Sequence, residues 1–277
     1  MPPAKQIKVK PLAEPIVSPA VPSRLFVGTS GWAYPTWKPG FYPREVPTRK
    51  LLSFYASQLN SVEVNYTFRT LPTRPMLEDW LAQTGDGFRF SFKAPQRITH
   101  FSRLKECEEQ VGALLEALFP VADAGKLGPI LFQLPPNFKA DLSRLGSFLS
   151  IPSLRLPAVP PIAFEFRHAS WFTEEAYVLL RAHNAALCIA ENEDLQTPEI
   201  HCAERHTCFR LRRSGGYTAE EIAGLATRIE RLATDRDVYV YFKHEDEPTG
   251  ALNAAAFARE SLRALAQASE QDPTACR

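Results

Sequence analysis

Two apolar runs, Val238-Tyr239-Val240-Tyr241-Phe242 and Pro129-Ile130-Leu131-Phe132, carry the strongest fold signal in the chain. Neither run alternates cleanly between apolar and polar residues, as a strand with one face in water would. Strands covered on both faces are typical of parallel sheets, in which helices connect each strand to the next. The two runs therefore indicate an α/β protein with a buried parallel sheet.

Outward from these runs, short apolar segments alternate with longer segments of helical periodicity. We expect eight strands, over Leu25–Ser30, Ser61–Asn65, Phe88–Lys93, Pro129–Gln133, Ile162–Phe166, Ala186–Ala190, Thr207–Leu211 and Val238–Phe242. We expect helices over Arg49–Leu59, Arg74–Gln83, Lys105–Phe119, Leu142–Leu149, Glu174–His183, Ala219–Ala233 and Leu252–Ala268. Thr173 and Thr218 each place a hydroxyl cap before acidic residues, which supports two of the helix starts.

The number of strand and helix units favours a closed barrel. Eight units in roughly 240 residues match the usual size of a TIM-type (β/α)8 barrel. The main alternative, an open doubly wound sheet, ordinarily has a glycine-rich first turn that binds phosphate. The first turn here reads Gly28-Thr29-Ser30-Gly31-Trp32 and lacks that pattern. We expect one barrel over residues 25–268, a flexible proline-rich extension over 1–24 and a tail over 269–277, although Glu191–Arg205 shows no clear helix.

The composition excludes several other classes of protein. Of the 277 residues, 45% are apolar and 23% are charged, unlike disordered, collagen-like or coiled-coil chains. Lys and Arg total 32 against 31 Asp and Glu, so the net charge is +1 and no overall field attracts nucleic acid or membrane. No stretch approaches the roughly 20 apolar residues that cross a bilayer. We expect a cytoplasmic protein in which any attraction for anions is local.

The cysteines indicate free thiols in a reducing compartment. The five residues are scattered and form no C-x-x-C pair and no zinc-type spacing with histidine; they are Cys107, Cys188, Cys202, Cys208 and Cys276. Cys188 lies inside the apolar run from Ala185 to Ala190, so we expect a small core residue there rather than a nucleophile.

Polar side chains follow the strands at the end where such a barrel builds its site. Nearly every strand delivers an ionisable or amide group there. We expect Glu63, Glu165 and His244 to be catalytic. The candidates for substrate binding are Trp32, Asn65, Lys93, Gln133, Arg167, Arg210, Arg212, Tyr217 and Lys243.

Each candidate also has a structural explanation. Glu63, Glu165 and Arg167 could belong to ion pairs, since such networks often mimic active sites. His168 precedes a helix start, where a capping role is more common than a general base. Gln133 could satisfy backbone groups at a turn. Three tryptophans could be either packing residues or ligand platforms: Trp32, Trp37 and Trp171.

Several motifs together resemble the domain of unknown function 72, the YecE-like family. They are Gly28-Thr29-Ser30-Gly31-Trp32, Phe41-Tyr42-Pro43, Ser61-Val62-Glu63-Val64-Asn65 through Thr67-Phe68, Phe92-Lys93-Ala94-Pro95 with Ile98-Thr99-His100, Leu127-Gly128-Pro129 through Gln133-Leu134-Pro135-Pro136, and Phe164-Glu165-Phe166-Arg167-His168 with Ser170-Trp171-Phe172. The resemblance covers the chain from about Leu25 to about Leu262, in the family's order. It implies a TIM-type barrel and no established reaction.

The chain departs from the family pattern at three strand ends. Arg212-Arg213 follows strand seven where many members resemble His-Gly, and Glu191 stands where Asp is frequent. Lys243-His244-Glu245-Asp246 replaces an Asn-Asn-Asp-like turn. These changes add positive charge near strand seven and put a histidine-based role there in doubt.

Three function classes follow from these residues. The first is an enzyme acting on an anionic ligand, a phosphate ester or nucleic-acid fragment, with arginines neutralising phosphate and Glu63 or Glu165 as acid or base. The second is metal-assisted hydrolysis or isomerisation by strand-end acids and a histidine: Glu63, Glu165, Glu191 and His168. The third is a module that binds nucleic acid without catalysis. The sequence names no cofactor and no protein partner.

Overall fold

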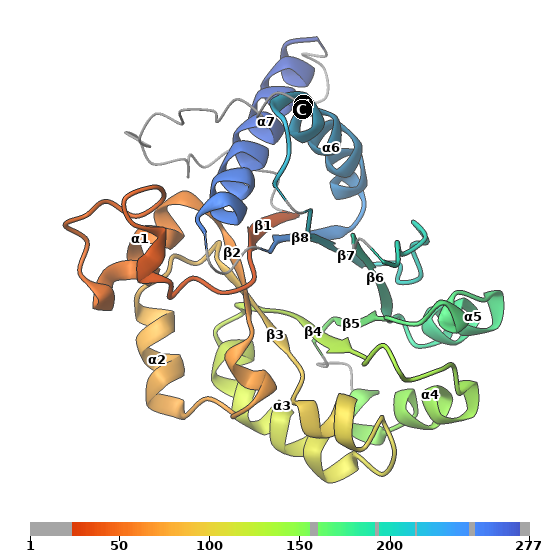
Figure 1. Ribbon diagram of the computed structural model, residues 1–277. Coiled ribbons are helices and arrows are strands. Elements are labelled where there is room, and N and C mark those ends of the chain that lie inside the picture. The colour runs from red at the N-terminus through yellow and green to blue at the C-terminus, as the bar shows by residue number, and fades with distance from the viewer. Residues whose placement is uncertain (1–23, 156–159, 192–193, 214, 244–246, 272–277) are drawn as a thin grey trace.

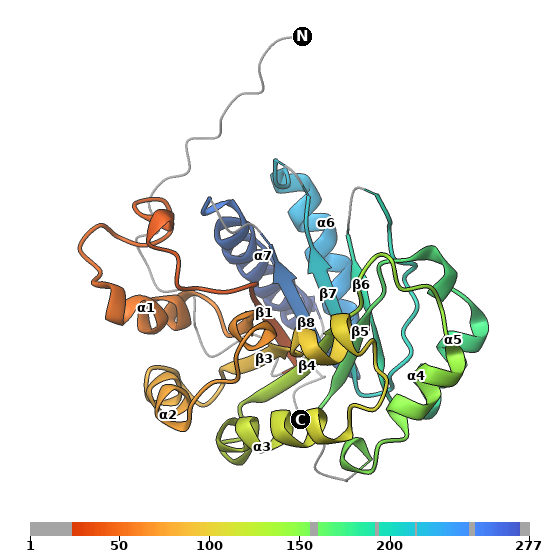
Figure 2. The same ribbon diagram turned by 60° about the horizontal axis from the view of Figure 1, so that its bottom comes forward.

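The computed structural model describes residues 24–155, 160–191, 194–213, 215–243 and 247–271. Within them, eight parallel strands lie side by side in the order β1-β8-β7-β6-β5-β4-β3-β2, and helices surround them (Figures 1 and 2). This sequential order, with β1 next to β8 and near β2, is that of a nearly closed (β/α)8 barrel. The expected fold class is confirmed, and an open doubly wound sheet is excluded because its strand order reverses at a switch point.

The strands begin and end within two residues of their predicted bounds. They are β1 Leu25–Thr29, β2 Ser61–Val64, β3 Arg89–Lys93, β4 Leu127–Gln133, β5 Ile162–Glu165, β6 Ala186–Ala190, β7 His206–Leu211 and β8 Asp237–Phe242. The largest difference is at β4, which begins at Leu127 instead of Pro129. Phe90 pairs with Leu127 whereas Phe92 pairs with Ile130, so a bulge interrupts the ladder there. A bulge accommodates Pro129, which has no N–H to donate.

In the part of the chain that the structure describes, seven α-helices connect or follow the strands. They are α1 Leu51–Gln58, α2 Arg74–Ala82, α3 Glu108–Asp123, α4 Leu142–Leu149, α5 Glu174–Ala182, α6 Ala219–Glu230 and α7 Thr249–Gln271. Short 3-10 helices cover Pro35–Trp37, Thr48–Lys50, Tyr66–Phe68, Pro152–Leu154, Ala169–Trp171 and Arg231–Thr234, and a π-helical turn covers Arg97–Phe101. Both predicted hydroxyl caps are present, because Thr173 accepts from Ala176 N and Thr218 forms a capping box with Glu221.

The helix α3 is shifted toward the C-terminus relative to its prediction, Lys105–Phe119. It starts later because Leu104 and Glu106 have left-handed backbones, with φ of 68° and 50°. It continues past Pro120, which removes only one intrahelical hydrogen bond, and thereby buries Val121 in the core.

Alternate residues of each strand enter two different apolar layers. Phe26 and Leu131 face a cluster inside the barrel, whereas Val27, Ile130 and Phe132 belong to the larger core between strands and helices. The inner cluster consists mainly of small residues and two tyrosines: Phe26, Leu131, Ala163, Ala186, Cys188, Ala203, Cys208, Tyr239 and Tyr241. Because both faces are apolar, the strands show no polar alternation. Cys188 is a buried free thiol in this cluster, as predicted.

The β1–β2 junction closes the barrel with little backbone pairing. Ser30 and Glu63 form an isolated parallel bridge, and Gly31 N donates to Glu63 O at 2.8 Å. A Cβ atom on Gly28 would lie 2.0 Å from Ser61 O, so no larger residue fits between these strands.

Two side chains replace the missing ladder hydrogen bonds of this junction. Asn60 accepts from Val27 N at 2.7 Å and donates to Leu25 O at 2.8 Å. The Tyr55 hydroxyl accepts from Thr29 N at 2.8 Å and donates to Ser61 O at 2.9 Å. Buried backbone groups are therefore satisfied although the two strands share few direct hydrogen bonds.

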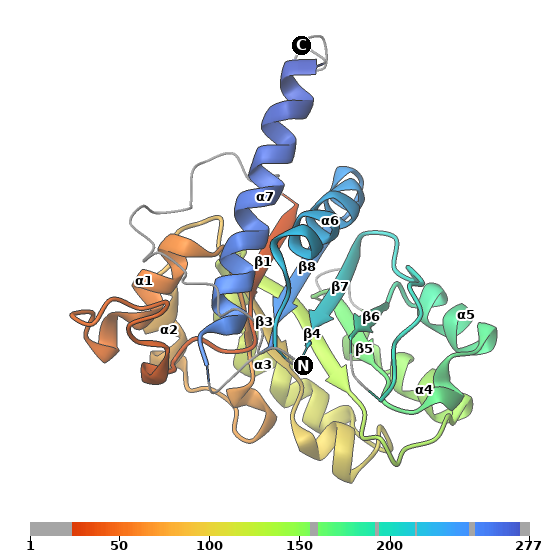
Figure 3. The ribbon, with the colours of Figure 1, turned by 45° about the horizontal axis from the view of Figure 1, so that its top comes forward.

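The first and last described residues can be compared with the predicted bounds of the barrel domain, residues 25–268. Arg24 already belongs to the barrel, since its carbonyl accepts from Val238 N at 2.7 Å. The helix α7 continues to Gln271, past the predicted end of the domain at 268, and runs beside α6 (Figure 3). The predicted extension, apart from Arg24, and the tail beyond 271 lie outside the described residues. Among the helices that the structure describes, none is long and apolar enough to cross a membrane.

Candidate functional site

A buried arginine joins two buried glutamates at the carboxyl end of the barrel. Arg210 of β7 donates through Nη2 to Glu63 Oε1 at 2.9 Å and through Nη1 to Glu165 Oε2. Glu63 is 0% exposed, and Glu165 and Arg210 are each 5% exposed. These residues come from β2, β5 and β7, which are far apart along the chain. The structure therefore brings together three of the predicted site residues in one cluster, named here the Arg210 cluster.

Two further polar side chains hold the carboxylates in place. Ser30 donates to Glu63 Oε1 at 2.7 Å across the β1–β2 junction. Gln133 donates through Nε2 to Glu165 Oε1 at 2.8 Å, because these two residues pair in the β4–β5 ladder. Gln133 thus orients a carboxylate rather than satisfying a backbone turn.

The charges of the Arg210 cluster stabilise one another. Burial alone raises the pKa of Glu165, but Arg210, Gln133 and Arg167 outweigh it, so the pKa lies below its usual value. Burial lowers the pKa of Arg210, and both glutamates reverse that effect and raise it. Glu63 Oε2 and Arg210 Nε remain buried without a hydrogen-bond partner in the part of the chain that the structure describes. Such atoms are rare in interiors and mark places where a ligand or water can bind.

Lys93 lies next to this cluster, at the end of β3. Its ammonium is 4.2 Å from the centre of the Phe68 ring, a cation–π contact. Burial and the neighbouring charge of Arg210 lower the pKa of Lys93 to about 8, while Glu63 and Glu165 act in the opposite direction. A lysine with this pKa holds or releases a proton near neutral pH.

Three more basic side chains lie in the segments that follow β3 and β5. Arg167 Nε lies 3.9 Å from Glu165 Oε1, and Arg103 donates to the Asn137 amide at 3.3 Å. Burial lowers the pKa of His100, and the positive charges of Lys93, Arg167 and Arg103 lower it further. These four basic residues, Lys93, His100, Arg103 and Arg167, are named here the basic rim.

The sequence interpretation missed His100 and Arg103. Both lie in the irregular segment between β3 and α3, where a π-helical turn is followed by Arg103, Leu104 and Glu106 in the left-handed region. Strained backbone and π turns are concentrated at functional sites. The available signal was the recurrence of basic residues after the β3 end, at Arg97, His100 and Arg103.

A second polar group forms after strands β6 and β7. Glu191 accepts from Arg213 Nη2 at 2.9 Å and from the Tyr217 hydroxyl, and Arg213 stacks 4.7 Å from the centre of the Tyr217 ring. Tyr217 is thus bound to Glu191 and not to the Arg210 cluster. Arg212 is exposed after β7, and the structure gives it no contact with that cluster.

The last strand brings one of its two candidates to the site. Lys243 follows β8, and its charge contributes to lowering the pKa of Lys93, so it faces the same end of the barrel. His244 lies outside the described residues.

The acidic residues that the sequence suggested as metal ligands form hydrogen bonds and ion pairs with other side chains. Glu63 and Glu165 bind Arg210, while Glu191 belongs to the separate group with Tyr217. His168 accepts from Ser170 N at 3.1 Å and caps the 3-10 helix Ala169–Trp171, so it has the capping role. Within the described ranges, no group of three His, Cys, Asp or Glu side chains is arranged to hold a metal ion.

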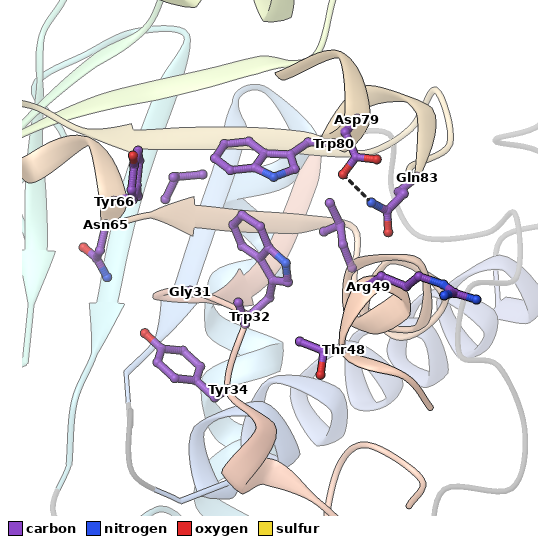
Figure 4. A pocket seen from close by; sticks show the side chains of 13 residues that line it. Gly31, Trp32, Tyr34, Thr48, Arg49, Asn65, Tyr66, Asp79, Trp80 and Gln83 are labelled. Atoms are coloured by element: carbon purple, nitrogen blue, oxygen red, sulfur yellow. Dashed lines mark hydrogen bonds between the residues drawn. The ribbon is translucent and has the colours of Figure 1, made fainter. Parts of the chain in front are cut away.

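The tryptophans divide into core residues and a pocket residue. Trp37 and Trp171 are each 0% exposed, and the Trp171 indole donates to Phe138 O at 2.7 Å. Trp32 instead lines a pocket beside the barrel mouth, together with Asn65 and Trp80 (Figure 4). Two predicted site residues, Trp32 and Asn65, therefore lie in this pocket and not in the Arg210 cluster.

Comparison with known proteins gives a consistent family. The family model described as "Protein of unknown function DUF72" matches residues 26–275. The UPF0759 protein YecE of Escherichia coli K12 is 30% identical over 188 residues, which are 66% of this chain and 63% of that protein. The UPF0759 protein YunF of Bacillus subtilis is 29% identical over 157 residues, 55% of this chain and 54% of that protein. The matched regions thus span less than two thirds of the length of these relatives.

Solved structures agree with the barrel. A DUF72 family protein from Thermotoga maritima is similar with a TM-score of 0.73 and 27% identity, covering 84% of this chain and 97% of that chain. A DUF72 family protein from Enterococcus faecalis has a TM-score of 0.69 and 19% identity, covering 86% and 95%. At that identity the second likeness concerns the fold alone.

Proposed function

The chain belongs to the DUF72 family of proteins of unknown function, and we propose that it binds and processes a small phosphate-containing anion at the carboxyl end of its barrel. The basic rim is the single observation that carries this proposal. Lys93 ends β3, His100 and Arg103 follow it, and Arg167 follows β5; the positive charges of Lys93, Arg103 and Arg167 lower the pKa of His100. A bound anion would relieve this repulsion.

The acids of the mouth neutralise the basic rim in part. Arg210 pairs with Glu63 and Glu165, and these two carboxylates also favour the charged form of Lys93, while Arg167 lies 3.9 Å from Glu165. In this proposal Arg210 therefore positions the two carboxylates and does not itself receive the phosphate. Arg167, whose side chain is 30% exposed, offers a planar fork of donors that matches phosphate oxygens in pairs.

Lys93 and Glu63 are the groups we assign to proton transfer. Lys93, with a pKa of about 8, can give a proton to a leaving oxygen of a phosphate ester at neutral pH. Glu63, whose Oε2 is buried and has no hydrogen-bond partner among the described residues, is our candidate for the proton acceptor. The arrangement fits a hydrolase or lyase acting on a phosphate ester.

Thermal stability in the presence of anions tests the proposal, since ligands that bind the native state raise Tm. We expect phosphate, sulfate and ribose 5-phosphate to raise Tm, and neutral ribose to leave it unchanged. Arg167→Gln should abolish the shift. The matched control is Arg205→Gln, which removes an exposed arginine just before β7, at the amino end of the barrel.

Two results would contradict this reading. One is the absence of any shift with all three anions. The other is an equal shift in Arg167→Gln, Arg205→Gln and the wild type, which would place anion binding away from the basic rim.

A further inference from the structure

A cavity of about 380 Å³ lies beside the mouth of the barrel. It is formed by the segment after β1, the segment after β2, and the helices α1 and α2 (Figure 4). Its volume is within the range of pockets that bind small molecules. The lining residues used below are Gly31, Trp32, Asn65, Asp79, Trp80 and Gln83.

Two indole rings supply the main surface of this pocket. Trp32 and Trp80 meet edge to face, with ring centres 5.0 Å apart and planes at 87°. Each ring is only partly buried, unlike Trp37 and Trp171. Their indole N–H groups have no hydrogen-bond acceptor within the residues that the structure describes. The pocket therefore offers aromatic faces together with two unused donors.

Several polar side chains also line the pocket, among them Thr48 and Arg49 (Figure 4). The Asn65 side chain is half-buried and makes no hydrogen bond to other described residues, so its amide can both donate and accept. Gln83 and Asp79 already bind each other at 2.8 Å. One free amide and two indole donors suit the edge of a planar ring with carbonyl or nitrogen acceptors.

The pocket and the candidate site adjoin the same β1–β2 junction. Gly31, in the pocket wall, donates to Glu63 O at 2.8 Å, and Asn65 is two residues beyond Glu63. Ser30, next to Gly31, binds the Glu63 carboxylate.

We propose that this pocket binds the neutral, planar heteroaromatic ring of a ligand whose phosphate lies at the basic rim, as in a nucleoside monophosphate. The assignment rests on the proposed function, because the phosphate end is taken from it. Stacking on indole suits any heteroaromatic ring, so the base itself is left open.

Calorimetric titration with matched ligands tests the assignment. The probes are the common nucleoside 5′-monophosphates, ribose 5-phosphate, glucose 6-phosphate and inorganic phosphate. At least one nucleotide should bind about tenfold or more tightly than ribose 5-phosphate, since base stacking on an aromatic side chain supplies that order of affinity. Trp32→Leu and Asn65→Ala should each reduce nucleotide affinity toward that of ribose 5-phosphate and leave ribose 5-phosphate binding unchanged. Phe119→Leu, which alters an exposed aromatic residue on α3 outside the pocket, is the control.

The outcomes separate the two proposals. If ribose 5-phosphate binds but no nucleotide binds more tightly, or glucose 6-phosphate binds most tightly, the ring assignment is wrong and the anion site stands. If none of the phosphate compounds binds, the proposed function fails, and the ring assignment, which rests on it, fails too. Unchanged nucleotide affinity in both Trp32→Leu and Asn65→Ala would place the base elsewhere.

Discussion

Replacing Lys93 with methionine should stabilise the protein at neutral pH while removing anion binding. The ammonium lies among other positive charges, and burial with Arg210 lowers its pKa from 10.5 to about 8. A lowered pKa means that the folded protein disfavours the charged form that predominates at pH 7. Methionine has a similar length and no charge, so the substitution removes that unfavourable charge.

The size and sign of the effect follow from the pKa. One pKa unit corresponds to about 1.4 kcal/mol, so the charged lysine destabilises the folded state by about 3 kcal/mol at pH 7. Water reaching this half-buried side chain reduces the penalty, and we expect about 1 to 3 kcal/mol. Between about pH 8 and 10.5 the unfolded chain binds a proton that the folded chain has lost, so wild-type stability rises with pH. The advantage of Lys93→Met should therefore fall to less than half at pH 9.5.

Urea denaturation at pH 7 and at pH 9.5 measures this difference. Because Lys93→Met and the wild type share all other titrating groups, the change of their stability difference with pH reports on Lys93. The control is the exposed Lys139→Met, whose difference from the wild type should not vary between the two pH values. A stability difference for Lys93→Met that is equal at both pH values would refute the reasoning, because it would mean that water solvates this ammonium fully.

Two other substitutions test the buried cluster and the barrel closure. Arg210→Met should lower the free energy of unfolding by about 3–5 kcal/mol at pH 7, because it leaves Glu63 and Glu165 buried without their cation. Burial without a partner cation raises the pKa of a carboxyl group. The Arg210→Met variant should therefore recover stability as the pH falls from 7 to 5. Equal destabilisation at pH 7 and at pH 5 would contradict this reasoning. Gly28→Ala should lower the free energy of unfolding by about 1–3 kcal/mol, because the added methyl group forces β1 and β2 apart. The control is Gly112→Ala in α3, where no atom would contact the added methyl group, and it should raise the free energy of unfolding by up to about 1 kcal/mol. Equal unfolding free energies for the two alanine variants would show that the close approach at Gly28 is not needed.

The strands were predictable because each is a short apolar run that enters two apolar layers. Ala186–Ala190 was predicted to the residue, and Leu25–Ser30 and Val238–Phe242 to within one residue. The exceptions have local backbone causes that periodicity does not contain. A bulge lets β4 start before Pro129, and left-handed residues delay the start of α3.

The sequence predicted which charged residues lie at the carboxyl end of the barrel, but not which of them form ion pairs with one another. The parallel topology brings Glu63, Glu165 and Arg210 to the same end, and that follows from strand order alone. The sequence suggested that Glu165 and Arg167 could belong to ion pairs, without naming their partners. In the structure Arg210 takes the closer contact with Glu165, and Arg167 stays at 3.9 Å. Which cation binds which acid depends on the position of β7 across the barrel, which no local pattern specifies.

The energetics of the mouth argue that its polar groups serve binding rather than stability. Apolar side chains of similar volume commonly replace a buried ion pair without loss of stability. Here the pair also leaves Glu63 Oε2 and Arg210 Nε without partners, and Lys93 stays charged at pH 7 although the fold disfavours that charge. Just below, the barrel is filled by small residues and by Tyr241, whose hydroxyl bonds Ser61 at 2.8 Å and also contacts Ser91. Two unsatisfied atoms and an unfavourable charge therefore occur together at the carboxyl end, and this combination supports the proposed ligand site.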